Sequence, residues 1–167
     1  MNKKYHIIDN ALNINDFDNL KNVVLSNNFN WFYQQNVAYK KQFKEYAEET
    51  FYFTHTFYEY DQPQSEHFNL LKPIFDKINL NCLARVKANL YPNVNKFINH
   101  PFHTDGDFKH KGAIIYLNTN NGKTVLKDGT EINSIENRIL LFNSFEEHCS
   151  TTCTDEKIRV NINLNYF

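Results

Sequence analysis

The stretch that decides the fold is IRVNINLNY, residues 158–166. It alternates without a break, with apolar side chains at Ile158, Val160, Ile162, Leu164 and Tyr166 and polar ones at Arg159, Asn161, Asn163 and Asn165. Successive side chains of a strand point to opposite faces, so the pattern predicts a β-strand with one face in a core. The polar face must look into water, the usual case for a β-sandwich, or into a polar cavity.

Other strands are predicted around this one. Residues 83–91 also alternate, with Ala84, Val86, Ala88 and Leu90 opposed to Arg85, Lys87, Asn89 and Tyr91. Further strands are expected at 112–118 and 138–143, and shorter ones around Val125 and Ile132. Many short strands separated by Asn, Gly and Asp turns indicate a β-sandwich or barrel. With only four glycines in the chain, tight turns must fall largely to Asn and Asp.

The first half of the chain predicts a supporting scaffold. Strands are expected at 5–8, 31–33 and 51–60, and a helix capped by Asn15 or Asp16. A second helix should start at Ser65 and be kinked or divided at Pro73. The apolar stripes of the two helices, which can cover the β-core, are Phe17, Leu20 and Val24, then Phe68, Leu71, Phe75 and Ile78. We therefore expect a single mainly-β domain, with a helical and strand scaffold at 1–81 and a β-core at 82–167.

Composition narrows the function. The 167-residue chain has a formal net charge of −1 and no basic stripe, so nothing favours nucleic acid or an anionic membrane as a partner. No long apolar run and no cationic-then-apolar N-terminal segment is present. Cys82, Cys149 and Cys153 are odd in number and form no CxxC pair, which favours a reducing compartment. We expect the cytoplasm, or the host cytoplasm if the chain is phage-encoded, and we disfavour a zinc cluster of Cys149 and Cys153 with His148.

The residues that carry chemistry lie in HPFHTDGD (100–107) and FEEHCST (145–151). Two imidazoles, His103 and His148, and the Asp105 carboxylate can occupy one face of an octahedral ion and leave three positions open. That facial arrangement is typical of non-haem Fe(II) oxygenases. An HxD triplet alone is weak evidence, because Asp105 could equally close a turn by accepting hydrogen bonds from backbone amides.

Arg159 adds a second function to the same region. Its planar guanidinium suits bidentate capture of a carboxylate, although most arginines are surface residues. Tyr91 and Tyr116 could add hydroxyl donors, and each is otherwise an ordinary half-buried tyrosine. The hypothesis of a carboxylate-binding site therefore rests on these residues taken together, and no single one of them would support it.

From Arg85 to Phe167 the chain resembles the double-stranded β-helix (jelly-roll) core of Fe(II)- and 2-oxoglutarate-dependent oxygenases, above all the prolyl-hydroxylase type. The matching pieces are LYPN (90–93), HTD (103–105), IIYLN (114–118), NRILLF (137–142), His148 and RVNINLNYF (159–167). Gly122-Lys-Thr stands where the family has a double glycine, and Arg159 stands where many collagen-type members have lysine.

The resemblance implies a role for each site residue. His103, Asp105 and His148 would be the catalytic Fe(II) ligands. Arg159 would pair with the distal carboxylate of 2-oxoglutarate, and Tyr91 and Tyr116 would hydrogen-bond the same co-substrate. Asn161 and, less directly, Asn163 would be smaller co-substrate contacts.

The resemblance also implies a reaction. The dioxygenase would use O2, with ascorbate as a candidate reductant, hydroxylate a C–H bond of a peptide prolyl residue or a small molecule, and release succinate and CO2. Asp105 disfavours a halogenase, while desaturation, demethylation and the oligomeric state stay open. The alternatives are a cupin-like zinc-binding barrel and a non-enzymatic binding protein on the same fold.

Substrate contacts are expected from two loops. One is 34–53, a candidate lid whose Tyr39, Phe43 and Tyr46 favour core packing, and the other is 102–111. Arg85, Lys87 and Asp107 could reach a substrate, but we expect them to be solvated surface charges.

Overall fold

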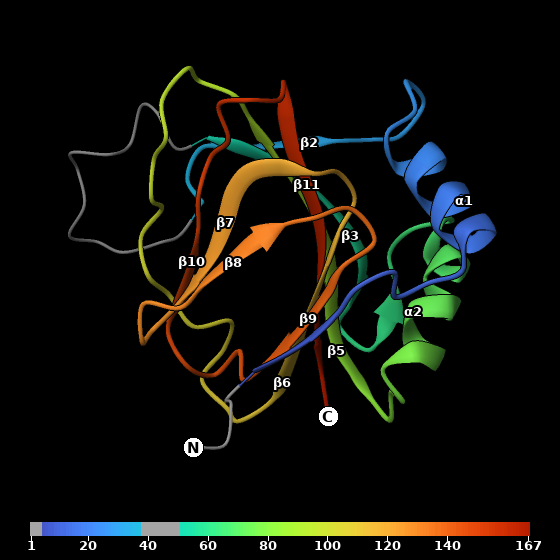
Figure 1. Cartoon of the computed structure of the whole chain (residues 1–167). Helices are drawn as coiled ribbons and strands as arrows, with labels where there is room; N and C mark the ends of the chain where they lie inside the picture. The colour runs from blue at the N-terminus through green and yellow to red at the C-terminus, as the bar shows by residue number, and fades with distance from the viewer. Residues whose placement is uncertain (1–4, 38–50) are drawn as a thin grey trace.

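The computed structural model describes residues 5–37 and 51–167 (Figure 1). The predicted roles of Tyr39, Phe43 and Tyr46, and most of the candidate lid, lie outside the described residues. The elements in chain order are β1 (Tyr5–Ile8), α1 (Ile14–Val24), β2 (Phe32–Gln34), β3 (Tyr52–Glu59), β4 (Gln62–Pro63), the 3-10 helix η2 (Phe68–Leu71), α2 (Lys72–Lys77), β5 (Leu83–Pro92), β6 (Lys111–Tyr116), β7 (Asn120–Leu126), β8 (Glu131–Ser134), β9 (Ile139–Phe142), β10 (His148–Ser150) and β11 (Ile158–Tyr166).

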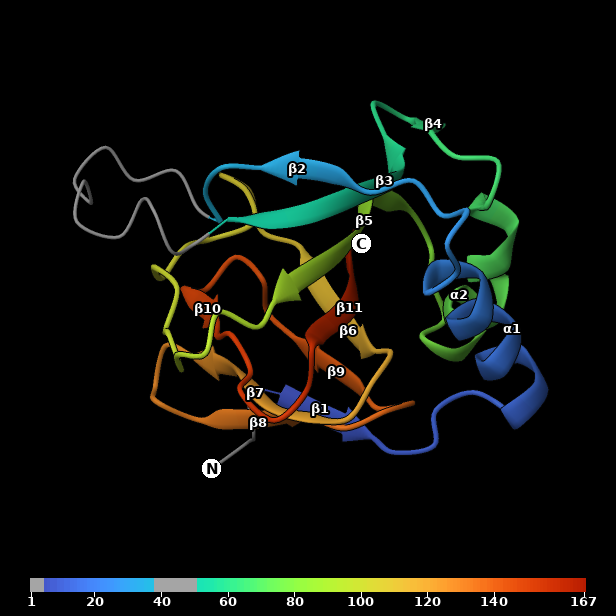
Figure 2. The same ribbon diagram turned by 90° about the horizontal axis from the view of Figure 1, so that it is seen from above.

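The strands form two antiparallel sheets. The larger sheet has eight strands in the order β1-β9-β6-β11-β5-β3-β2, with β4 beside β3, and the smaller sheet has the order β10-β7-β8. Helices α1 and α2 lie together on one side of the molecule, and β7, β8 and β10 lie away from them (Figures 1 and 2). This arrangement confirms the predicted mainly-β class with supporting helices.

Strand β11 lies at the centre of the larger sheet and has the predicted bounds. It pairs with β5 on one side, where Arg159 lies opposite Tyr91 and Asn163 lies opposite Lys87. It pairs with β6 on the other side, where Ile162 lies opposite Ile115. Because paired residues of an antiparallel sheet point to the same side, the polar side chains of β5 and β11 share one face.

The apolar face of this sheet packs against the helices. Its core includes Val86, Ala88, Val160, Ile162 and Leu164, all at 0 % exposure, with the buried side chains of the helices completing it. Those helical side chains are Phe17, Leu20 and Val24 of α1, Leu71 of η2 and Ile74 of α2, with Ile78 just beyond. Burial of this size supplies the main driving force for folding.

The starts of both helical segments differ from those predicted. The second segment begins with η2 at Phe68 and not at Ser65. Helix α1 is capped by Asn13, whose side chain accepts a hydrogen bond from the Asp16 backbone N–H at 3.0 Å, and not by Asn15 or Asp16. Asn13, Asn15 and Asp16 are all good capping residues, so the sequence did not separate them. Pro73 divides the second helical segment as predicted, because it stands in the first turn of α2, where no N–H partner is needed.

Tight turns rely on asparagine and aspartate, as the shortage of glycine predicts. Among the described residues, six that are not glycine have a left-handed backbone, and five of them are Asn or Asp. They are Asn10, Tyr60, Asp61, Asn79, Asn95 and Asn137. Short polar side chains tolerate this conformation because they bond to the local backbone.

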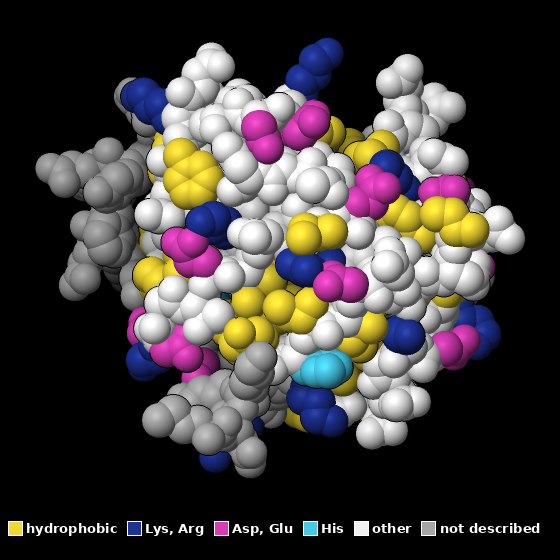
Figure 3. Space-filling model, viewed as in Figure 1, with side chains coloured by type: hydrophobic (Ala, Val, Ile, Leu, Met, Phe, Trp, Pro, Cys, Tyr) yellow, Lys and Arg dark blue, Asp and Glu magenta, His cyan; other side chains and the backbone are white. Residues whose placement is uncertain are grey.

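The polar face of the larger sheet is buried, not solvated. Arg159 is 0 % exposed, and Asn89, Asn161 and Asn165 are nearly inaccessible. The cavity interpretation of the polar face is therefore the correct one. On the outer surface shown in Figure 3, basic, acidic and hydrophobic side chains are interspersed. None of the helices in the described residues has the length and apolar character needed to span a membrane.

Candidate functional site

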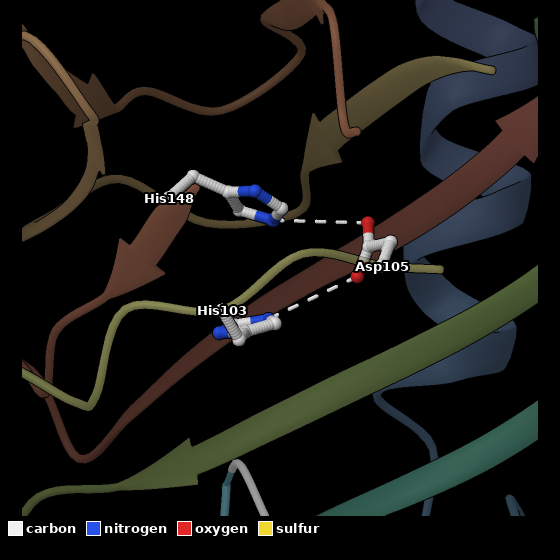
Figure 4. Close-up of side chains that lie close together, drawn as sticks. All are labelled: His103, Asp105 and His148. Carbon is white, nitrogen blue, oxygen red and sulfur yellow. Dashed lines mark ion pairs between the residues drawn. The ribbon is translucent and has the colours of Figure 1, made fainter. Parts of the chain in front are cut away.

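The three predicted metal ligands converge. The ligand atoms of His103, Asp105 and His148 all lie within 4.8 Å of one another, and this is the one group of three or more potential ligands among the described residues. His103 Nε2 lies 3.8 Å from one Asp105 carboxylate oxygen, and His148 Nε2 lies 3.7 Å from the other (Figure 4). Two imidazole nitrogens and a carboxylate oxygen at such separations can share one cation.

A backbone bridge places the two histidines directly opposite each other. His103 and His148 form an isolated antiparallel bridge in which each backbone N–H donates to the other residue's carbonyl at 2.9 Å. Their side chains therefore lie on the same side, with ring centroids 4.8 Å apart. His148 begins β10 of the smaller sheet, and Asp105 is fixed by its N–H, which donates to the Ser144 carbonyl at 3.1 Å. His148 thus comes from the smaller sheet, whereas Asp105 lies in the segment between β5 and β6.

Backbone carbonyls set the tautomer of both rings. Nδ1 of His103 lies 3.2 Å from the Pro101 carbonyl, and Nδ1 of His148 lies 3.0 Å from the Glu146 carbonyl. A carbonyl only accepts, so each Nδ1 carries a proton, and in the neutral ring the lone pair belongs to Nε2, the nitrogen nearer Asp105. Burial and the neighbouring His148 lower the pKa of His103, which favours the neutral form that a metal requires. The sequence did not identify these orienting groups.

Asp105 is an ionised carboxylate held by several donors. The amides of Asn163 and Asn165 each donate to one of its oxygens at 3.0 Å, and an Arg85 guanidinium nitrogen lies 3.4 Å from the other. Burial alone would raise the pKa of Asp105, but His148, Arg85 and the two amides outweigh it and lower that pKa to about 2. The expectation that Arg85 is a solvated surface charge was therefore wrong, because its guanidinium contacts the Asp105 carboxylate.

Arg159 lies inside the protein without an acidic partner. Its Nε donates to the Ser134 hydroxyl at 2.8 Å and its Nη2 to the Thr124 hydroxyl at 3.2 Å. Its Nη1 is buried and has no hydrogen-bond partner, and no described carboxylate forms an ion pair with it. A buried guanidinium left unpaired is costly, so this arrangement fits an anion that arrives from outside the chain.

Gly122 makes room for the arginine. A Cβ at this position would lie 2.5 Å from Arg159 Cδ, 2.8 Å from the Asn120 side-chain oxygen and 3.0 Å from the Thr152 carbonyl. No side chain larger than hydrogen fits there unless the arginine moves. The sequence suggested Gly122 only as a remnant of a motif, whereas the structure gives it a steric reason.

The remaining predicted residues lie around Arg159 and the ligands. The guanidinium carbon lies 5.2 Å from the Tyr91 ring centre and 5.8 Å from that of Tyr116, whose hydroxyl donates to Thr124 at 2.9 Å. Asn161 accepts a hydrogen bond from Asn89 at 3.1 Å, whereas Asn163 contacts the metal ligand Asp105. A small cavity joins these groups and is lined by Asn89, Tyr91, His103, Ile114, Thr124, His148, Cys149, Ser150, Asn161 and Asn163.

The cysteines do not join the ligand group. Cys149 and Cys153 are buried free thiols, and burial raises the pKa of Cys149 to about 11. A thiol with so high a pKa is a poor source of the thiolate that zinc binds. This environment does not favour a zinc cluster of Cys149 and Cys153 with His148, and neither thiol belongs to the group of converging ligand atoms.

The two sheets, with the three ligands between them, define the double-stranded β-helix class of fold, and comparisons with solved structures agree. No protein-family model matches the sequence, and no curated protein matches it either. The chain is similar in structure to a viral collagen prolyl hydroxylase from Paramecium bursaria Chlorella virus-1, with a TM-score of 0.62 and 14 % identity over 98 % of this chain and 95 % of that one.

Two further structures have the same fold. A prolyl hydroxylase from Trichoplax adhaerens, solved with a hypoxia-inducible-factor peptide, has a TM-score of 0.68 and 13 % identity over 99 % of this chain and 84 % of that one. A Pseudomonas putida prolyl-4-hydroxylase has a TM-score of 0.59 and 16 % identity over 98 % and 92 % of the two chains. These likenesses confirm the predicted fold.

Proposed function

We propose that this protein is an Fe(II)- and 2-oxoglutarate-dependent dioxygenase that hydroxylates a C–H bond of a peptide prolyl residue or of a small molecule. The buried, unpaired Nη1 of Arg159 carries this proposal, because it lies on the same sheet face as the groups that hold Asp105. Structural similarity to prolyl hydroxylases and 2-oxoglutarate–Fe(II) oxygenases supports it.

The spacing along β11 suits a short dicarboxylate. Arg159 and Asn163, which bonds to Asp105, are four residues apart on one strand, a separation of ~13 Å between their backbones. The arginine side chain reaches toward the smaller sheet, where Ser134 of β8 and Thr124 of β7 accept its hydrogen bonds, and a co-substrate bound at the metal would bridge the distance to the guanidinium. The stacked ring of Tyr91 and the Thr124 hydroxyl fix the guanidinium at its end of the cavity.

The donor set also suits ferrous iron. Because the Nδ1 atoms of His103 and His148 donate to carbonyls, Nε2 is the atom of each neutral ring that can bind a metal, and Asp105 presents a carboxylate that stays ionised at neutral pH. When bound, iron and 2-oxoglutarate supply the oxidising chemistry, in which O2 is consumed, succinate and CO2 leave and one oxygen atom enters the substrate. The protein's part is to orient the two imidazoles through their Nδ1 protons, to hold the distal carboxylate and to exclude water.

Two measurements test the proposal. With redox-inert Mn²⁺ in place of iron, calorimetry should detect 2-oxoglutarate binding that needs the metal and is lost in Arg159→Met. With Fe(II), succinate formation should be coupled to O2 uptake and should disappear in His103→Ala. Arg138→Met is the matched control, because Arg138 pairs with Asp9 at the surface and should leave both measurements unchanged.

The outcomes separate the competing functions. Turnover that persists in His103→Ala would exclude the proposed iron site. Tight zinc binding together with no response to 2-oxoglutarate would instead support the cupin-like barrel.

A further inference from the structure

The face that β5 and β11 turn toward the site is strongly cationic. The eight side chains on this face are Arg85, Lys87, Asn89, Tyr91, Arg159, Asn161, Asn163 and Asn165. Three of them carry positive charge and none carries negative charge. The Asp105 carboxylate contacts Arg85, and a ligand at Arg159 would neutralise a second cation. The third cation, Lys87, pairs neither with Asp105 nor with a ligand bound at Arg159.

Lys87 stands beside the metal ligands. It lies between Asn89 and Arg85 on its face of β5 and directly opposite Asn163 on β11. Asn89 and Asn163 line the cavity, and Asn163 donates to Asp105. The positive charge of Lys87 is also close enough to His103 to contribute to the lowered pKa of that ring. The ammonium group is therefore placed to act at the metal centre.

Two stacked tyrosines separate Lys87 from Arg159. The rings of Tyr52 and Tyr91 are nearly parallel, at 11° with centroids 5.6 Å apart. Arg159 lies 5.2 Å from the centre of the Tyr91 ring, and Lys87 Nζ lies 5.5 Å from the centre of the Tyr52 ring. Each cation thus has its own aromatic partner. Arg159 and Lys87 therefore offer two separate positions for negative charge. A short co-substrate bound at Arg159 occupies only one of them.

Lys87 forms no ion pair with any carboxylate of the described residues. Its one hydrogen bond to a described residue goes to the Tyr52 hydroxyl at 3.3 Å. Burial lowers the pKa of Lys87 to about 8, with the repulsion of Arg85 adding to the effect. The Asp105 and Glu59 carboxylates attract the ammonium and partly oppose this shift, but neither forms an ion pair with it. A largely buried ammonium without a paired carboxylate is a weakly satisfied charge, and such a group binds an incoming anion strongly.

We propose that Lys87 is a second anion-binding residue of the site and receives a carboxylate group of the primary substrate. This inference rests on the proposed function. A single ammonium offers one compact charge with up to three N–H donors, which matches a monoanion such as an α-carboxylate or an acidic side chain. Arg85 uses one guanidinium nitrogen, Nη2, for both Asp105 and Asn165, and so can lend additional positive potential without leaving its partners.

Matched pairs of probes test the inference. The protein is loaded with Mn²⁺ and saturated with 2-oxoglutarate, which occupies Arg159. N-acetyl amino acids with a free carboxylate are then compared with their N-methylamides by calorimetry and by thermal melting. At least one acid should bind about 10-fold or more tightly than its amide, the size expected for a charge-assisted hydrogen bond.

Three variants assign that preference to its residue. Lys87→Met should abolish the advantage of the acid, and Lys87→Arg should largely preserve it. Lys72→Met, which removes an exposed lysine paired with Asp76 on α2, should leave it unchanged. Lys72→Met should also bind 2-oxoglutarate like the unmodified protein, and a cooperative thermal unfolding transition shows that the Lys87 variants are folded.

Two results would overturn the inference: acids that bind no better than amides across the whole set, or an acid preference that survives in Lys87→Met. Failure of the proposed function looks different. In that case the unmodified Mn²⁺-loaded protein would not bind 2-oxoglutarate at all.

Discussion

Replacing Gly122 by alanine tests the geometry of the Arg159 site with the smallest possible change. The new Cβ would lie 2.5 Å from Arg159 Cδ, whereas carbon atoms in contact normally stand ~3.5–4.0 Å apart. The arginine side chain must therefore retreat by about 1 Å. The bond from its Nε to Ser134, now 2.8 Å, would lengthen beyond the hydrogen-bonding range.

The expected magnitude follows from that displacement. A charge-assisted hydrogen bond contributes about 1.5–3 kcal/mol, so 2-oxoglutarate should bind about tenfold to a hundredfold more weakly to Gly122→Ala. Overpacking should also lower the free energy of unfolding by ~1–3 kcal/mol. The affinity for Mn²⁺ alone should change little, since no ligand moves. Calorimetric titrations with Mn²⁺ and then with 2-oxoglutarate measure both affinities.

Gly129→Ala is the matched control. A Cβ at Gly129 meets nothing within 4 Å, although its left-handed backbone, with φ +83°, makes alanine strained. This variant should lose about 1 kcal/mol of stability and keep full affinity for 2-oxoglutarate. A folded Gly122→Ala protein that binds 2-oxoglutarate as tightly as Gly129→Ala does would refute the steric argument.

Three further predictions concern Asp105, its hydrogen-bond partner Asn165, and Lys87. Asn165→Val should weaken metal binding about 10- to 100-fold, because Asp105 loses a donor that orients it; a metal titration that matches the parent would contradict this role. Folding lowers the pKa of Asp105 from 3.8 to about 2, so the ionised carboxylate contributes roughly 2 kcal/mol to the stability of the apoprotein. This contribution is complete above pH 4 and is lost as the pH falls through 2. Chemical denaturation of the parent and Asp105→Asn should therefore converge over that range, and a constant difference would argue against a lowered pKa. Binding of an acidic substrate probe should weaken as the pH rises through about 8, where Lys87 loses its proton. Binding of 2-oxoglutarate should not follow the same pH profile.

The strand pattern could be predicted from the sequence because alternation is a local property. The bounds of β11 agree with the stretch 158–166, and its polar residues share a face with those of β5, as their periods required. The convergence of His103, Asp105 and His148 was also predictable, since few residue types bind iron and their order along the chain restricts the choice. The structure brings those three side chains together.

The orienting contacts could not be predicted in the same way. Asn163 and Asn165 donate to Asp105 from about sixty positions further along the chain, and alternation specifies a face without specifying what lies across from it. Arg85 and Lys87 were expected to be solvated for the same reason. Composition and period cannot show that a loop folds back over a strand and excludes water from it.

The histidine tautomers show how much the loop backbone contributes to the site. Each ligand histidine donates Nδ1–H to the carbonyl two residues before it, in the segments Pro101–His103 and Glu146–His148. His110 makes the same contact with the Phe108 carbonyl at 2.7 Å, which leaves its Nε2 to accept from Asn165 at 3.0 Å. Asn165 in turn donates to Asp105. A third histidine is therefore set by the same local rule and supports the carboxylate ligand indirectly. Asn165 thus connects His110 to Asp105, and contacts within the protein already position the carboxylate without a metal.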